Sequence, residues 1–69
     1  MRVAISALKR GHDPNDIFHA IDNAIAVTHL DDDVELIVGP ARNGALLEVA
    51  IREGNTVFHC MPARAKFLR

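Results

Sequence analysis

The sequence contains one cysteine, no tryptophan and no tyrosine, and each shortage excludes a class of protein. The lone Cys60 cannot form an internal disulfide, and no Cys/His spacing suggests a zinc site. Without Trp or Tyr, the chain lacks most of the aromatic platforms on which single-stranded nucleic acids stack. No run approaches the roughly 18 apolar residues of a membrane span, and no signal-peptide layout is present. We therefore expect no membrane partner and a cytoplasmic location.

The length and composition predict a single small domain over residues 1–69. Of these residues 49% are hydrophobic, with only three phenylalanines, so the composition favours a core of Ile, Val, Leu and Ala rather than disorder. A domain of this size buries only ~60% of the surface that its unfolded chain exposes, so the core is marginal. Oligomerisation or a partner protein would compensate for that small core.

The charged residues divide unequally between the two halves of the chain, although the net charge is only −1. Residues 1–38 hold three basic and seven acidic side chains, whereas residues 39–69 hold five basic and two acidic ones. Such asymmetry is one of the few compositional signs of an anionic partner. The excess of basic residues predicts that an anionic partner would bind the C-terminal half.

Two helices are predicted in the N-terminal part. Residues 3–10 favour a short helix that ends at Gly11. Asp13 is a suitable N-cap, Pro14 suits the first helical position and Asp16 lies in the first turn, so a second helix is expected to begin there. Its apolar stripe comprises Ile17, Phe18, Ile21, Ala24 and Ile25.

The rest of the chain has the patterns of strands joined by short turns. The predicted strands are residues 26–30, 34–38, 45–52 and 56–61. Asp31 to Asp33, Asn43-Gly44 and Glu53 to Asn55 separate them, and Pro62 ends the last strand. The fold class is therefore α+β: one or two N-terminal helices packed on a four-stranded antiparallel sheet.

The last strand and the tail that follows it hold the candidate functional residues. Alternation predicts that Phe58 and Cys60 face the helices, whereas Val57, His59 and Met61 lie on the other, open face of the sheet. After Pro62 come Arg64, Lys66 and Arg69, and Arg42 joins them if its loop lies at the same end of the sheet. An imidazole can move protons near neutral pH, and guanidinium groups bind phosphate bidentately. This combination suits a ribonuclease site.

Other interpretations of these residues remain open. His59 could be an ordinary surface histidine, and the basic tail could be solvated or docked on the core through Phe67 and Leu68. His12, His19 and His29 carry less weight than His59. Asp31 to Asp33 lack the spacing of a calcium loop, and Cys60 and His59 point to opposite faces, so neither metal binding nor cysteine catalysis is predicted.

Four segments together resemble a known family. They are Lys9-Arg10-Gly11, the Val-Gly-Pro-x-Arg-x-Gly run at 38–44, Leu-Leu-Glu-Val at 46–49 and His-x-Met-Pro-Ala-Arg-x-Lys-Phe-Leu at 59–68. The chain resembles, over roughly residues 5 to 69, the BrnT-like toxins of the RelE-like toxin–antitoxin superfamily. It departs from that pattern at Ala45 and Ala65, where related sequences often carry a basic residue and a proline.

The resemblance implies a RelE-like fold and a toxin that inhibits translation by cleaving mRNA, on or off the ribosome, without a metal or other cofactor. It implies a cognate antitoxin that alone contacts operator DNA, in assemblies such as a heterotetramer. Arg42, Arg64, Lys66 and Arg69 would bind phosphate, and the catalytic group would be His59, Arg64 and Lys66. Proton transfer by His59 is inferred from its chemistry.

Two alternatives to the ribonuclease function involve no catalysis. In the first, the open sheet face and the basic tail bind a partner protein such as an antitoxin, burying Val57 and Met61. In the second, two copies pair through their sheet edges as a homodimer.

Overall fold

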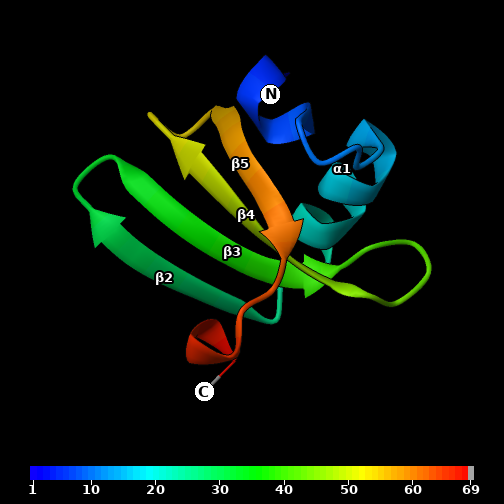
Figure 1. Ribbon diagram of the computed structural model, residues 1–69. Coiled ribbons are helices and arrows are strands. Elements are labelled where there is room, and N and C mark those ends of the chain that lie inside the picture. Colours follow the sequence, from blue (N-terminus) through cyan, green and yellow to red (C-terminus); the bar gives the residue numbers. More distant parts are fainter. Residues whose placement is uncertain (69) are drawn as a thin grey trace.

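The chain folds as one five-stranded sheet with helical segments against one face (Figure 1), and the structure, a computed structural model, describes residues 1–68. The elements in chain order are β1 (Arg2–Val3), η1 (Ile5–Leu8), α1 (Pro14–Asp22), β2 (Ala26–Asp31), β3 (Val34–Pro40), β4 (Leu46–Arg52), β5 (Thr56–Pro62) and η2 (Ala65–Phe67). Here η denotes a single 3-10 turn. Among residues 1–68, every helix is too short and too polar to cross a membrane.

The strands lie in the order β1-β5-β4-β3-β2, so β2 to β5 form a meander of strands adjacent in sequence. These four strands pair antiparallel, because the turns between them are too short for a parallel crossover. In contrast, β1 pairs parallel with β5. The α+β class is confirmed, but the sheet is five-stranded and mixed rather than four-stranded and antiparallel as predicted.

The helix predicted over residues 3–10 is present only in part, as the 3-10 segment η1. The chain is extended before η1: the Arg2 amide donates to the Asn55 carbonyl and the Ala4 amide to the Val57 carbonyl, both at 2.8 Å. These ladder bonds with the edge of β5 are long-range, so local helix propensity does not reveal them. Only the short 3-10 turn η1 remains of the predicted helix.

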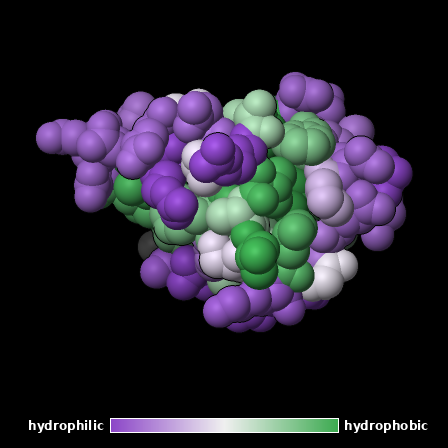
Figure 2. Space-filling model, turned by 90° about the horizontal axis from the view of Figure 1, so that it is seen from above, coloured by the Kyte–Doolittle hydropathy of each residue, from purple (hydrophilic) through white to green (hydrophobic). Residues whose placement is uncertain are grey.

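The N-terminal segment leaves large apolar side chains in solvent. Met1 and Ile5 are both exposed, Ile5 to 83%. Figure 2 views the molecule from above, the side where this segment lies, and shows apolar residues gathered in the middle of a largely polar surface.

The helix α1 begins where the sequence predicts. Asp13 is the N-cap, its carboxylate accepting from the Asn15 amide at 2.8 Å, and Pro14 is the first helical residue. The helix is shorter than its apolar stripe suggested, because the backbone amide of Asn23 already closes the last turn on His19. Ile25 therefore lies beyond the helix and is exposed, not buried under it.

The main core lies between the sheet and the two N-terminal helical segments. Its fully or nearly buried members are Ala7, Ile17, Ala20, Ala41, Leu47, Val49, Ile51, Val57 and Cys60. α1 packs across β3 and β4, and η1 packs on β5. Aliphatic side chains from both layers thus supply the hydrophobic stabilisation of a domain that has few aromatic residues.

A β-bulge in β5 changes the predicted facing of its first residues. Ile51 pairs with Val57 and Ala50 with His59, so Phe58 is the extra residue between them. Val57 is therefore fully buried in the core rather than on the opposite face as predicted. Cys60 faces the helices and His59 faces away from them, as predicted, whereas Phe58, which was also predicted to face the helices, contacts Arg52 on the other face.

Gly39 allows α1 to pack directly against β3. A Cβ atom at this position would collide with the backbone carbonyl of Ala20 on α1. Backbone atoms of a packed helix cannot move aside as a flexible side chain can, so the contact requires the absence of a side chain.

We expect Gly39→Ala to destabilise the fold by about 3 kcal/mol, because the added methyl group overpacks the interface between α1 and β3. Chemical denaturation monitored by circular dichroism measures the change. Ala45→Ser in the exposed loop that follows β3 is the matched control, with an expected effect within about 0.5 kcal/mol. Equal stabilities for both variants would contradict the close approach of helix and strand.

Candidate functional site

The face of the sheet opposite α1, here called the η2 face, carries a buried carboxylate. On β4, Leu47 and Val49 point into the helix-covered core, so Glu48 between them points to the η2 face. Its side chain is fully buried. A carboxylate is almost never buried to this extent without partners, which makes Glu48 the centre of the candidate site.

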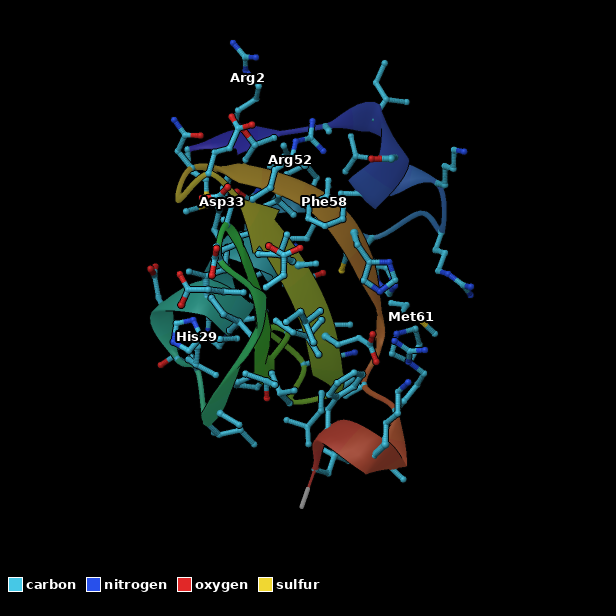
Figure 3. The ribbon with its side chains drawn as sticks, turned by 90° about the vertical axis from the view of Figure 1, so that its left-hand side faces the viewer. Arg2, His29, Asp33, Arg52, Phe58 and Met61 are labelled. Atoms are coloured by element: carbon cyan, nitrogen blue, oxygen red, sulfur yellow. The ribbon has the colours of Figure 1, made fainter. Side chains whose placement is uncertain are left out.

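The η2 face is not the open surface that the sequence predicted. Leu36, Val38 and Ala50 lie on it, in register beside Glu48, and all three are at most 3% exposed. Figure 3 views the molecule from this side: Arg52 and Phe58 lie together toward one end, and η2 crosses the other end. A ligand would therefore meet the rim of a partly covered face.

Arg64 holds the Glu48 carboxylate through both its backbone and its side chain. Its amide donates to Oε1 at 3.0 Å, its Nε to Oε1 at 2.9 Å and its Nη2 to Oε2 at 2.8 Å. The chain reaches this position because Pro62 ends β5 and the Ala63 amide still donates to the Leu46 carbonyl. Arg64 is 46% exposed, and since residues 1–68 supply no acceptor for its remaining guanidinium N–H groups, these can meet a phosphate or another anion.

His59 makes the fourth hydrogen bond to Glu48. Its Nε2 lies 3.1 Å from Oε2, and its side chain is 34% exposed. Because an ionised carboxylate only accepts hydrogen bonds, Nε2 must carry a proton here. In the neutral ring the lone pair is then on Nδ1, which is the atom that can accept a proton from a substrate.

Glu48 stays ionised despite its burial. Burial alone would raise the pKa of Glu48, but the hydrogen bonds from the Arg64 side chain and backbone and from His59 outweigh it and lower that pKa to about 2. The same contact with Glu48 raises the pKa of the Arg64 guanidinium. The carboxylate is thus a fixed negative charge that orients a histidine and an arginine at any physiological pH.

Phe67 links Lys66 to Arg64. The Arg64 guanidinium carbon lies 5.1 Å from the centre of the Phe67 ring, and the Lys66 ammonium nitrogen lies 5.0 Å from it. Both distances suit cation–π contacts. Of the predicted site residues, His59 and Arg64 thus share Glu48, and Arg64 and Lys66 share Phe67.

Arg42 lies away from this cluster, although its loop is at the same end of the sheet. Its Nε and backbone amide donate to Asp16 at 2.8 and 3.0 Å, and its Nη2 is 3.3 Å from Asp13. The side-chain hydrogen bond from Arg42 lowers the pKa of Asp16. Since both acids belong to the N-terminus of α1, Arg42 is committed to the helix side, opposite Arg64. Arg69 lies outside the described residues.

The cysteine and two of the other histidines lie outside the candidate site. Burial raises the pKa of the Cys60 thiol to about 11, so it carries no nucleophilic thiolate at neutral pH. His19 Nδ1 lies 2.8 Å from the Pro40 carbonyl, and exposed His29 lies 3.8 Å from Glu35. Within residues 1–68, no three His, Cys, Asp or Glu side chains are placed to hold a metal ion, and no pocket is formed.

Glu48 was missed in the sequence, although a signal for it was present. The strand reads Leu-Leu-Glu-Val-Ala-Ile, so Glu48 is a single charge inside an apolar run. A charge in such a run has to find a partner when the strand is buried on both faces.

Comparisons with protein-family models, curated proteins and solved structures find no match to this chain.

The first prediction for this site concerns acid stability. The folded pKa of Glu48 is about 2 and its ordinary value is 4.5, so its ionisation contributes roughly 3 kcal/mol that is fully present above pH 4.5. This contribution is lost as the pH falls from 4.5 through 2. Urea unfolding at a series of pH values measures the slope.

Glu48→Gln should remove most of that slope, because glutamine does not titrate. Glu53→Gln, in the exposed turn after β4, should retain it. A Glu48→Gln protein with the same loss of stability in acid as the parent would show that other groups cause it.

The second prediction concerns the proton on His59. In ¹⁵N NMR, the neutral imidazole should be protonated at Nε2, with a downfield proton that exchanges slowly because it is hydrogen-bonded to Glu48. Glu48→Gln should speed its exchange. Protonation of His59 at Nδ1 instead would contradict the assigned hydrogen bond.

Proposed function

We propose that this chain is the toxin component of a bacterial type II toxin–antitoxin system, with a RelE-like fold, and that it cleaves RNA without a metal ion. The supporting observation is that His59 and Arg64 both bond Glu48 on the η2 face, and that Lys66 shares the Phe67 ring with Arg64. These residues combine a proton carrier, a carboxylate that orients it and two cations. These are the groups that cleavage of RNA through its own 2′-hydroxyl requires.

In the proposed reaction, His59 Nδ1 accepts the proton of the ribose 2′-hydroxyl as that oxygen attacks the adjacent phosphorus. The bond from phosphorus to the 5′ oxygen breaks, and the imidazolium returns its proton to that leaving oxygen. The products are a 2′,3′-cyclic phosphate and a free 5′-hydroxyl. The outward N–H groups of Arg64 and the Lys66 ammonium stabilise the negative charge that develops on the phosphoryl oxygens.

Glu48 acts as the positioning residue in this scheme. It keeps the Nε2 proton of His59 in place, so the ring presents Nδ1 to the substrate, and it stabilises the imidazolium that forms. It also holds Arg64 side-on, leaving the far edge of the guanidinium for phosphate. Arg42, paired with Asp16, is no longer among the proposed phosphate ligands.

The proposed partners are mRNA, free or on the ribosome, and a cognate antitoxin, through which alone operator DNA would be bound. Since the chain carries a formal net charge of −1, RNA binding would depend on the local cations of the η2 face rather than on overall charge. A heterotetramer with the antitoxin suits this scheme.

A second candidate function is a binding module without catalysis. It is favoured by the engagement of Arg64, because three of its hydrogen bonds go to Glu48 and serve to anchor the C-terminal segment. Val57 is buried in the core, so a partner on this face would contact Met61 and the cations instead. Tight binding to the product of a neighbouring gene, with no RNA cleavage across a pH series, would establish this function.

We expect His59→Ala to reduce cleavage of a short RNA by about 100-fold or more, because it removes the proton carrier, and to relieve growth inhibition in bacteria. Lys66→Ala should reduce cleavage by a smaller factor. The measurements are gel analysis of purified protein with labelled RNA, and colony counts on expression. Unfolding monitored for each variant separates activity from stability.

Arg64→Ala is a less direct test of activity, because it leaves the buried Glu48 carboxylate without its cation and so also destabilises the fold. Arg64→Lys keeps the charge and loses the bidentate geometry. Lys9→Ala removes an exposed cation of the N-terminal segment and is the control. Expression of the parent chain that leaves growth and total RNA unchanged would overturn the ribonuclease proposal.

A further inference from the structure

The edge strand β2 has the properties of a protein-binding surface. It is the last strand of the sheet, so one side of its backbone has no neighbouring strand among residues 1–68. Figure 1 shows it at the margin of the sheet, beside β3, and α1 packs on β3 and β4 rather than on β2. The opposite edge is formed by β1, which is only two residues long, whereas β2 is six residues long.

Apolar side chains flank this edge. Ile25 is 64% exposed, Val27 52% and Leu30 51%. Proteins usually protect a free edge with lysine, proline or a bulge. Neither lysine nor proline occurs in β2, and its bulge lies only at the end, between His29 and Asp31, after regular pairing from Ala26 onward. The edge is therefore straight enough to accept another strand.

The surroundings of β2 are acidic. Residues 22–35 contain five Asp and Glu side chains and no Lys or Arg. Glu53 is close as well, since its amide donates to the Asp33 carbonyl at 2.9 Å. The nearest cation in the sheet register is Arg52, which pairs with Val34. Its guanidinium lies over the Phe58 ring on the η2 face rather than among these carboxylates.

We infer that β2 binds an extended segment of a partner protein in which apolar residues alternate with lysine or arginine. The segment adds a sixth strand to the sheet, so backbone hydrogen bonds give affinity. Its apolar side chains cover Val27 and Leu30, and its cations face the carboxylates around Asp31 to Asp33. Potentials of opposite sign then favour association and select the partner.

The charges decide against a second copy of this chain as the occupant. Two β2 strands would bring together two surfaces of the same sign, and six-residue strands alone bury less than the roughly 1,200 Å² of a stable interface. The inference does not depend on the proposed ribonuclease activity, because β2 is separated from β5, which carries His59, by two strands.

The test uses the whole chain and a synthetic ten-residue peptide that alternates valine with lysine, added to the ¹⁵N-labelled protein. We expect its binding to shift amide signals of β2 first and to weaken about tenfold in Val27→Lys, which removes apolar contact and adds a repelling charge. Ile5→Lys, at the exposed apolar residue of η1, is the matched control and should leave binding unchanged.

Two further peptides separate the contributions. One has every lysine replaced by glutamate; the other keeps the charges but is N-methylated at alternate residues, which removes the donors that a paired strand needs. Both should fail to bind. Equal binding of the N-methylated peptide, equal losses in Val27→Lys and Ile5→Lys, or no binding at millimolar peptide would overturn the inference. Sedimentation showing a dimer of the free chain that Val27→Lys dissociates would overturn it too, by assigning the edge to a second copy.

Discussion

The ion pair between Glu48 and Arg64 is the contact on which the η2 face depends. Removing a carboxylate from water costs several kcal/mol, and here four hydrogen bonds, three from Arg64 and one from His59, offset that cost. The backbone amide of Arg64 takes part, so the contact fixes the course of the chain after β5 as well as a side chain. One carboxylate thereby holds the C-terminal segment on the sheet and orients the histidine beside it.

Arg42 and Arg64 illustrate how the faces of a sheet separate residues with similar chemistry. Each follows a Pro-Ala pair at the end of a strand, and each donates from its backbone and side chain to an acid. Asp16 is on α1 and Glu48 is on the opposite face, so the two arginines cannot act on one phosphate. Arg42 joins the β3–β4 loop to the helix N-terminus, whereas Arg64 remains beside His59 and Lys66.

The two surfaces with inferred functions use different parts of the sheet. The polar cluster lies on the η2 face over β4 and β5, and the acidic edge lies on β2. Because β3 and β4 intervene between β2 and β5, a partner strand on the edge and a phosphate at the cluster do not compete for the same backbone. A chain of 69 residues has room in this way for both the proposed site and the inferred docking edge.

Local patterns in the sequence determined the start of α1 at Asp13 and Pro14 and the four strands of the meander, because capping, alternation and turn residues act over a few positions. Contacts between residues far apart in the sequence decided the features that such local patterns do not predict. The pairing of β1 with β5 shortened a predicted helix to the 3-10 segment η1, and the bulge at Phe58 moved Val57 into the core. The partner of Glu48 likewise comes from 16 residues further along the chain. A buried charge finds its partner by position in space, so only the tertiary structure shows that Glu48 links His59 to Arg64 and that Arg42 lies apart from them.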